Sequence, residues 1–235
     1  MSIRDISDVL HIGKTTVYYH ARDYCRKMTK LDSKLLGESE KGYIIGLFLG
    51  DGSLNRGAKI PRYIVRFALD EQRDQDIAEK VVHIFEKAHK KSSVFNREKV
   101  KLVKVCSKEL VQYIQAHIEY TVKDNNQKEK KLILDKSWSL AFQYGVLAGI
   151  IDSDGHVHKH LGVEIKTTSI LILKSVLALL NNLGIVAKLR KAKPTKNSYS
   201  KKTCYVIYIP SLQTKTSRDD IPSVKIMRFS EKHAK

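Results

Sequence analysis

Apolar positions along the chain follow a helical period in some stretches and a strand period in others, and the same succession of stretches occurs twice. In each half an apolar helix that ends in Asp-Gly is followed by strand-like segments and an amphipathic helix. The repetition predicts an α+β protein of two αββαββ(α) halves related by a pseudo-twofold axis, with the Asp-Gly helices at their interface. The expected elements are strands over 60–69, 156–168 and 204–209, a strand or hairpin over 93–106, and helices over 74–89, 109–118, 138–152 and 170–183.

Stretches without periodicity set the boundaries of these halves. Residues 123–131 are polar and charged, as is typical of a surface linker, and residues 212–235 give no clear period. We therefore divide the chain into a small helical N-terminal extension with its linker (1–38), a first half (39–122), a linker (123–136), and a second half with the C-terminal tail (137–235).

The N-terminal extension has a pattern of its own. Apolar residues recur at helical spacing from Ile3 to Leu10, a tight turn is expected at 11–14, and a second helix can begin at Thr15 or Thr16. This arrangement resembles the helix-turn-helix of many regulators, but a plain helical hairpin packed on the main domain explains it equally well. In the first case the second helix offers a set of side chains to a major groove, namely Lys14, Thr15, Thr16, Tyr19 and His20.

The two Asp-Gly helices carry the same spacing of small residues. Gly42, Gly46 and Asp51 recur 103 positions later as Gly145, Gly149 and Asp154. Small residues at every fourth position form a smooth stripe on one helix face, which lets two helix backbones approach closely. If the stripes face each other, two carboxylates meet at the helix ends and repel unless a cation or a proton lies between them. One Asp-Gly would be an ordinary turn, whereas two at matched positions predict a metal site.

Composition narrows the class of partner. The chain has 235 residues, of which 43 are Lys or Arg and 25 are Asp or Glu, giving a net charge of +18. So basic a surface favours nucleic acid over a merely charge-rich surface, because acidic residues are not raised to match. Cys25, Cys106 and Cys204 are scattered and odd in number, so neither a disulfide framework nor a zinc pair is predicted. Without a signal segment or a membrane-length apolar run, an intracellular location, in the cytoplasm or an organelle, is expected.

The second helix end spells a known signature. Residues 147–155 read LAGIIDSDG and resemble the LAGLIDADG motif almost letter for letter, and residues 44–52, IIGLFLGDG, look like a looser copy. The chain therefore resembles the LAGLIDADG homing endonucleases in their single-chain, two-motif form. The resemblance implies that the antiparallel sheets of both halves form a saddle over DNA.

The resemblance also implies a chemistry. Asp51 and Asp154 would hold a divalent metal, with Mg²⁺ expected and Mn²⁺ or Ca²⁺ able to replace it in binding, and the backbone carbonyls of Gly50 and Ser153 would complete the coordination. Lys108 matches the position of a catalytic-pocket lysine, although a solvated lysine at a helix start explains it as well. Asp152 is either a third ligand or a structural support, and Leu49 at the twin position favours support.

Basic residues on the strands are the candidates for contacts to bases and phosphates. Three alternating histidines at 156, 158 and 160 suit DNA contact or solvation better than zinc, because no partner ligand has suitable spacing. The predicted DNA contacts are Arg56, Lys59, Arg62, Arg66, Arg97, Lys99 and Lys101 in the first half, and Lys159, Lys166, Lys188, Arg190, Lys191, Lys193, Tyr199 and Lys201 in the second.

Two functions remain in competition. The first is a monomeric, site-specific double-strand DNA endonuclease that leaves 3′ overhangs at a long target site and promotes the homing of an intron or intein, as the family does. The alternative is a cleavage-inactive nucleic-acid-binding protein of the same fold, either an RNA maturase or a helix-turn-helix regulator. Retention of both Asp51 and Asp154 favours the endonuclease, whereas the N-terminal pattern favours the alternative.

Overall fold

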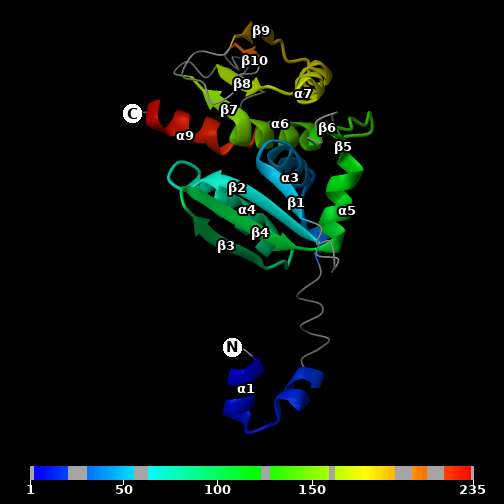
Figure 1. Ribbon diagram of the computed structural model, residues 1–235, viewed down its shortest axis with the longest axis vertical. Coiled ribbons are helices and arrows are strands. Elements are labelled where there is room, and N and C mark those ends of the chain that lie inside the picture. The colour runs from blue at the N-terminus through cyan, green and yellow to red at the C-terminus, as the bar shows by residue number, and fades with distance from the viewer. Residues whose placement is uncertain are drawn as a thin grey trace.

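The expected α+β architecture, with antiparallel sheets, is confirmed in a computed structural model of the chain (Figure 1). The structure describes residues 3–20, 31–55, 63–122, 128–158, 162–193, 203–210 and 220–233. No helix in these ranges is both long and apolar enough to cross a membrane.

The elements of the first half follow the predicted order. They are η1 (Ser33–Leu35), α3 (Glu38–Asp51), β1 (Gly52–Asn55), β2 (Ile64–Asp70), α4 (Gln75–Lys87), β3 (Ser92–Arg97), β4 (Val100–Cys106) and α5 (Lys108–His117). The hairpin of β5 (Ile118–Val122) and β6 (Lys128–Leu132) then leads to the second half, partly within the stretch that the sequence predicted to be a plain linker.

The second half repeats the order with α6 (Leu140–Asp154), β7 (Gly155–Val157), β8 (Val163–Thr167), α7 (Ile170–Asn182), β9 (Lys188–Ala192), β10 (Cys204–Ile209) and α9 (Val224–His233). The two four-stranded sheets have matching strand orders, β1-β2-β4-β3 and β7-β8-β10-β9. In Figure 1 these sheets lie on opposite sides of the central pair α3 and α6. Helix α9, in the tail where no period was found, runs beside α6 at its Asp154 end.

The two motif helices touch through their backbones. A Cβ added to Gly46 would lie 2.0 Å from the carbonyl oxygen of Val146, and one added to Gly149 would lie 2.3 Å from that of Tyr43. Both distances are far inside van der Waals contact, so only glycine fits at these two positions. Around this contact one continuous core extends through both halves and includes Phe48, Phe67 and Phe85.

The turn between β3 and β4 decides which side chains face outward. The sequence predicted a strand or hairpin over 93–106 with a single alternation. The structure has a hairpin in which Glu98 and Lys99 form a two-residue turn, with Glu98 at φ 57°. Arg97 pairs with Val100 across that turn, so the alternation changes phase between the two strands. Lys101 therefore lies on the opposite face from Arg97, whereas the sequence placed both on one face.

Candidate metal centre and DNA interface

The two motif aspartates are the last residues of the paired helices. Asp51 ends α3 and Asp154 ends α6, and the following glycines, Gly52 and Gly155, have extended backbones that begin the first strand of each sheet. A Cβ on Gly50 would lie 2.8 Å from Oδ2 of Asp154 and 2.3 Å from Oγ of Ser153. The carboxylate of the second half therefore lies directly against the backbone of the first.

Burial acts on both carboxylates, and the charge of Asp154 acts on Asp51 as well. Burial and the neighbouring Asp154 charge raise the pKa of Asp51 from its ordinary 3.8 to about 7, while Lys225 and Lys130 oppose the shift. Burial also raises the pKa of Asp154, against the ammonium groups of Lys130 and Lys225. Near neutral pH the pair is thus poised between holding a proton and holding a cation.

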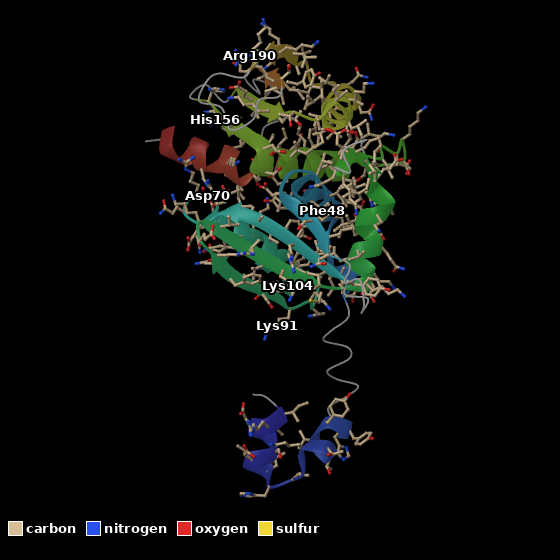
Figure 2. All side chains as sticks on the ribbon, viewed as in Figure 1. Phe48, Asp70, Lys91, Lys104, His156 and Arg190 are labelled. Carbon is tan, nitrogen blue, oxygen red and sulfur yellow. The ribbon has the colours of Figure 1, made fainter. Side chains whose placement is uncertain are left out.

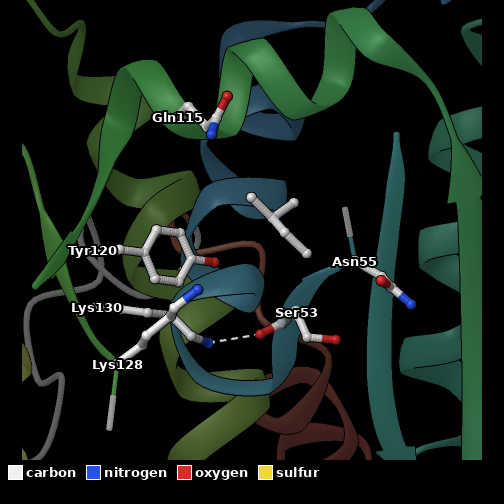
Figure 3. Close-up of a pocket in the computed structure, with 8 residues that line it drawn as sticks. Ser53, Asn55, Gln115, Tyr120, Lys128 and Lys130 are labelled. Atoms are coloured by element: carbon white, nitrogen blue, oxygen red, sulfur yellow. Dashed lines mark hydrogen bonds between the residues drawn. The ribbon is translucent and has the colours of Figure 1, made fainter. Parts of the chain in front are cut away.

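Two lysines that the sequence analysis did not single out hold the ends of the motif helices. Lys130 Nζ, from β6, donates to the carbonyl oxygens of Phe48 (2.8 Å), Leu49 (2.9 Å), Gly50 (3.1 Å) and Gly52 (2.8 Å). Burial lowers its pKa to about 8, although both motif carboxylates oppose this shift. Figure 3 shows Lys128 and Lys130 turned toward β1 from the β5–β6 hairpin.

Lys225 occupies the corresponding place in the second half. Its Nζ donates to the carbonyl oxygens of Ser153 (3.2 Å) and Gly155 (3.0 Å). A cation at a helix C-terminus compensates the partial negative charge of the last carbonyls. No local sequence signal marks either lysine, because one comes from the linker and the other from the tail.

Lys108, the lysine that the sequence suggested, is placed elsewhere. It is the first residue of α5, and its Nζ lies 5.9 Å from the centroid of the Tyr63 ring. Tyr63 directly precedes β2, and Ile64 pairs with Asn55 at the end of β1 remote from the motif. The structure therefore brings Lys130 and Lys225, but not Lys108, to the carboxylates.

Asp152 is a structural anchor in this site. Its side chain is fully buried and accepts hydrogen bonds from Tyr43 Oη (2.9 Å), Ser223 Oγ (2.6 Å) and the backbone N–H groups of Val224 (2.9 Å) and Lys225 (3.0 Å). These bonds fix the start of α9 on α6 and so place Lys225. The interpretation of Asp152 as a support rather than a third ligand fits this geometry.

A cavity between the halves borders the end of α6 at Gly155. It includes the turn after β2, the start of β7 and two basic residues of α9. Its lining consists of Asp70, Arg73, Asp74, Gly155, His156, Val157, Lys225 and Arg228. Asp70 accepts hydrogen bonds from the backbone of Gln72 (3.0 Å) and Arg73 (2.9 Å), which orders this turn beside the cavity.

The donor set suits a hard divalent cation. Asp51 and Asp154 supply two carboxylates, and the carbonyls of Gly50 and Ser153 each keep a second lone pair beside the lysine bond. No group of three or more His, Cys, Asp or Glu suited to a metal occurs in the described parts of the chain. Two carboxylates and two carbonyls would leave further coordination places of a hard divalent cation to water and phosphate. His158 instead contacts Glu164 (3.1 Å), and His160 lies outside the described residues.

Each four-stranded sheet has one face packed on the core and an opposite, outer face, and basic residues lie on both outer faces. In the first half Arg66 pairs with Lys104 across β2 and β4, on the face opposite the buried Phe67. Lys104 was missed by the sequence analysis because of the change of phase at the turn. In the second half Lys166, Lys188 and Arg190 share the outer face, where Arg190 contacts Glu164 at 2.7 Å. Figure 2 shows Lys104 and Arg190 on the two separate sheets.

Two of the predicted DNA contacts lie on the helix side of their sheets. Lys101 lines a cavity with residues of α4. Lys191 pairs with Tyr205, which lies on the same face of β10 as the buried Ile207. For Lys101 this corrects the face expected from the sequence, and DNA contact by either lysine stays a prediction. Lys99 lies in the β3–β4 turn, and Lys193 follows β9 and is exposed. The other predicted contacts, Arg56, Lys59, Arg62, Lys159, Tyr199 and Lys201, fall outside the described residues.

Comparison with known proteins agrees with this architecture. Residues 141–222 match the family model of the LAGLIDADG-like domain. None of the curated proteins matches the chain significantly in sequence. The homing endonuclease I-DmoI in complex with DNA and Ca has a TM-score of 0.57 at 16% identity, covering 84% of this chain and 98% of that one.

Two further structures show the same fold. Mesophilic variants of I-DmoI give a TM-score of 0.51 at 17% identity, covering 82% of this chain and 94% of that one. Full-length DUF199/WhiA from Thermatoga maritima gives 0.50 at 14% identity, covering 83% and 59% respectively. I-DmoI structures with target DNA have been solved in the presence of Mn and Mg as well.

The findings converge on the resemblance first seen in two short motifs. Both motif helices, both sheets and their pseudo-twofold pairing are present in one chain, and the second half matches the family model. This chain has the fold of the homing endonuclease I-DmoI, and its residues 141–222 match the LAGLIDADG-like domain.

Proposed function

We propose that the protein is a monomeric, site-specific endonuclease that hydrolyses both strands of a long DNA target and leaves 3′ overhangs, in the service of intron or intein homing. The observation that carries the proposal is the meeting of Asp51 and Asp154, which have raised pKa values, at the ends of a helix pair between two basic sheet faces. Burial makes the ionised forms of these two carboxylates costly, and such a pair suits a cation-dependent reaction better than a structural role.

Asp51 and Asp154 hold the cation, for which we propose Mg²⁺ with Mn²⁺ or Ca²⁺ replacing it in binding. Once bound, such an ion makes a water nucleophilic and neutralises charge on the phosphate. Gly50 leaves the space into which the Asp154 carboxylate fits. Lys130 and Lys225 fix the carbonyls around the site and add positive charge where the phosphate gains negative charge during hydrolysis.

The outer sheet faces hold the duplex. Arg66 and Arg190 suit guanine edges, and the outward lysines, Lys104, Lys166 and Lys188, suit phosphates. Because two motif halves are present in one chain, a monomer presents both halves of the site. The two halves, related by the pseudo-twofold axis, suit cleavage of the two strands across a minor groove.

The test uses a plasmid library with randomised inserts, incubated with the full chain and Mg²⁺, followed by sequencing of the ends of linearised plasmids. We expect linear products with 3′ overhangs at a shared sequence, and none with EDTA. Asp51→Asn and Asp154→Asn should bind the selected duplex without cutting it. Asp135→Asn, at an exposed aspartate outside the site, is the matched control and should cut normally.

Two results would contradict the proposal. Cleavage that persists in the Asp51→Asn/Asp154→Asn double variant would place the reaction elsewhere. Tight binding of a selected duplex or of an RNA without any cleavage in Mg²⁺ or Mn²⁺ would favour the cleavage-inactive regulator or maturase.

A further inference from the structure

The N-terminal residues form two short helices joined by a tight turn. Helix α1 (Ile3–Leu10) ends before His11, and a second helix begins at Lys14 and is described to residue 20 (Figure 1). His11 has φ 50°, the left-handed conformation that reverses the chain after a helix. The turn between the helices is therefore sharp and only three residues long.

Side-chain and backbone bonds lock this turn. The N–H of Ile12 donates to the carbonyl of Ser7 (3.2 Å), and Ser7 Oγ donates to the carbonyl of Ile12 (2.6 Å). Because both bonds join the same two residues, the second helix leaves α1 in one fixed direction.

The packing between the two helices involves few buried side chains. Within the described residues 3–20, the buried side chains are Ser7 (8% exposed) and Val17 (7% exposed). Ser7 is small and Val17 is apolar, and such side chains suit the close approach of two short helices. One face of the second helix is thus used for packing, and the rest is left to solvent.

The exposed face of the second helix carries polar side chains and two tyrosines, and it has no acidic side chain. Lys14, Thr15 and Thr16 occupy its first turn, and Tyr18 and His20 follow, all of them exposed. Residues 11–20 contain one lysine and two histidines and neither Asp nor Glu. Hydroxyls, imidazoles and an ammonium at the start of a helix match base edges and phosphates of a major groove.

We propose that residues 3–20 are a helix-turn-helix module that places the helix beginning at Lys14 in the major groove of double-stranded DNA. It is a second DNA site, separate from the two sheet faces. The protein then reads two blocks of sequence, one through each site. This inference does not rest on the proposed cleavage, because it concerns binding alone.

The test is a selection of random-sequence duplexes by the full chain in EDTA, so that cleavage plays no part. We expect the enriched duplexes to contain two blocks of shared sequence, with guanine N7 in one block protected from methylation. In the variant Lys14→Ala/Thr15→Ala that block should lose its enrichment and protection, and affinity for the two-block duplex should fall ~10-fold or more. Lys34→Ala removes an exposed lysine elsewhere and should leave both blocks.

Three outcomes would overturn the inference. The first is a single block in the wild-type selection, and the second is retention of both blocks by Lys14→Ala/Thr15→Ala. The third is concentration-dependent self-association in sedimentation that this variant abolishes, which would make the helix face a contact between copies. Thermal unfolding of the variant, followed by circular dichroism, should match the wild type, so that a loss of the block reports on the helix face.

Discussion

Asp51 occupies a place in which its charged form is costly. Burial and the Asp154 charge raise its pKa from 3.8 to about 7, so the folded protein keeps a proton that the unfolded chain releases. The free energy of unfolding therefore falls as the pH rises from about 4 through about 7 in the absence of metal. A bound divalent cation removes this cost, which links the stability of the site to its occupancy.

Asp51→Asn should therefore stabilise the metal-free protein at neutral and alkaline pH. With EDTA present, we expect its thermal midpoint to exceed that of the wild type at pH 8, with a much smaller difference at pH 4. Asp135→Asn is the matched control and should show no gain at pH 8, because backbone hydrogen bonds hold the pKa of Asp135 below its ordinary value. A gain that does not change with pH would refute the electrostatic explanation.

Asp152 shows the opposite use of a carboxylate. It is buried, yet four donors surround it, and two of them are backbone N–H groups of α9. Asp152→Ala leaves these donors unsatisfied, which should lower the free energy of unfolding by about 3 kcal/mol or more. Ser223→Ala removes one donor and should cost about 1 kcal/mol. Urea denaturation measures both, and a larger loss for Ser223→Ala would be inconsistent with the anchor.

At the scale of elements, the sequence predicted what repeats and missed what depends on distant contacts. The glycine stripes and the apolar periods gave the helix pair, the order of elements and both motif aspartates. The sequence did not predict the roles of Lys130 and Lys225, because each contacts its motif helix from an element about 70 to 80 positions away in the chain. Helix α9 was not predicted either, since Asp152 fixes its start and its own pattern is weak.

Local pattern also could not decide which alternate side chains of a strand face outward. A single alternation was read through residues 93–106, but two turn residues reverse the phase and move Lys101 to the helix side. Lys104 takes the outward place instead. The position of the turn depends on Glu98 adopting a positive φ, a conformation for which glycine would have been the expected signal.

The helix pair makes its own prediction. Gly46→Ala places a methyl group 2.0 Å from the carbonyl oxygen of Val146, so the backbones must separate. We expect a loss of about 3 kcal/mol or more in the free energy of unfolding, at the upper end of overpacking effects. Gly37→Ala, with its nearest contact at 3.7 Å, is the control without overpacking and should cost only about 0.5–1 kcal/mol, because alanine is a poorer N-cap residue than glycine. Equal urea midpoints for Gly46→Ala and Gly37→Ala would show that the two motif helices are not in backbone contact.

At the scale of the whole molecule, we expect the net charge of +18 to contribute to DNA binding mainly through basic side chains on the outer faces of the two sheets. The described outer faces present six basic residues, namely Arg66, Arg97, Lys104, Lys166, Lys188 and Arg190. If each neutralises one phosphate, affinity for duplex DNA should fall ~10³-fold between 50 and 200 mM salt. The halves contribute together, because the core joins them into one body.

Lys104 and Lys101 form a matched pair that tests this picture, since they are three residues apart on one strand and differ in the face they occupy. Lys104→Ala should reduce the slope of log affinity against log salt by about 0.9, which corresponds to one lost phosphate contact. Lys101→Ala removes the same charge from the helix side and should leave the slope unchanged. Fluorescence anisotropy with a duplex of fixed length gives both slopes. Equal slopes for the two variants would mean that total charge, rather than the outward face of the sheet, governs binding.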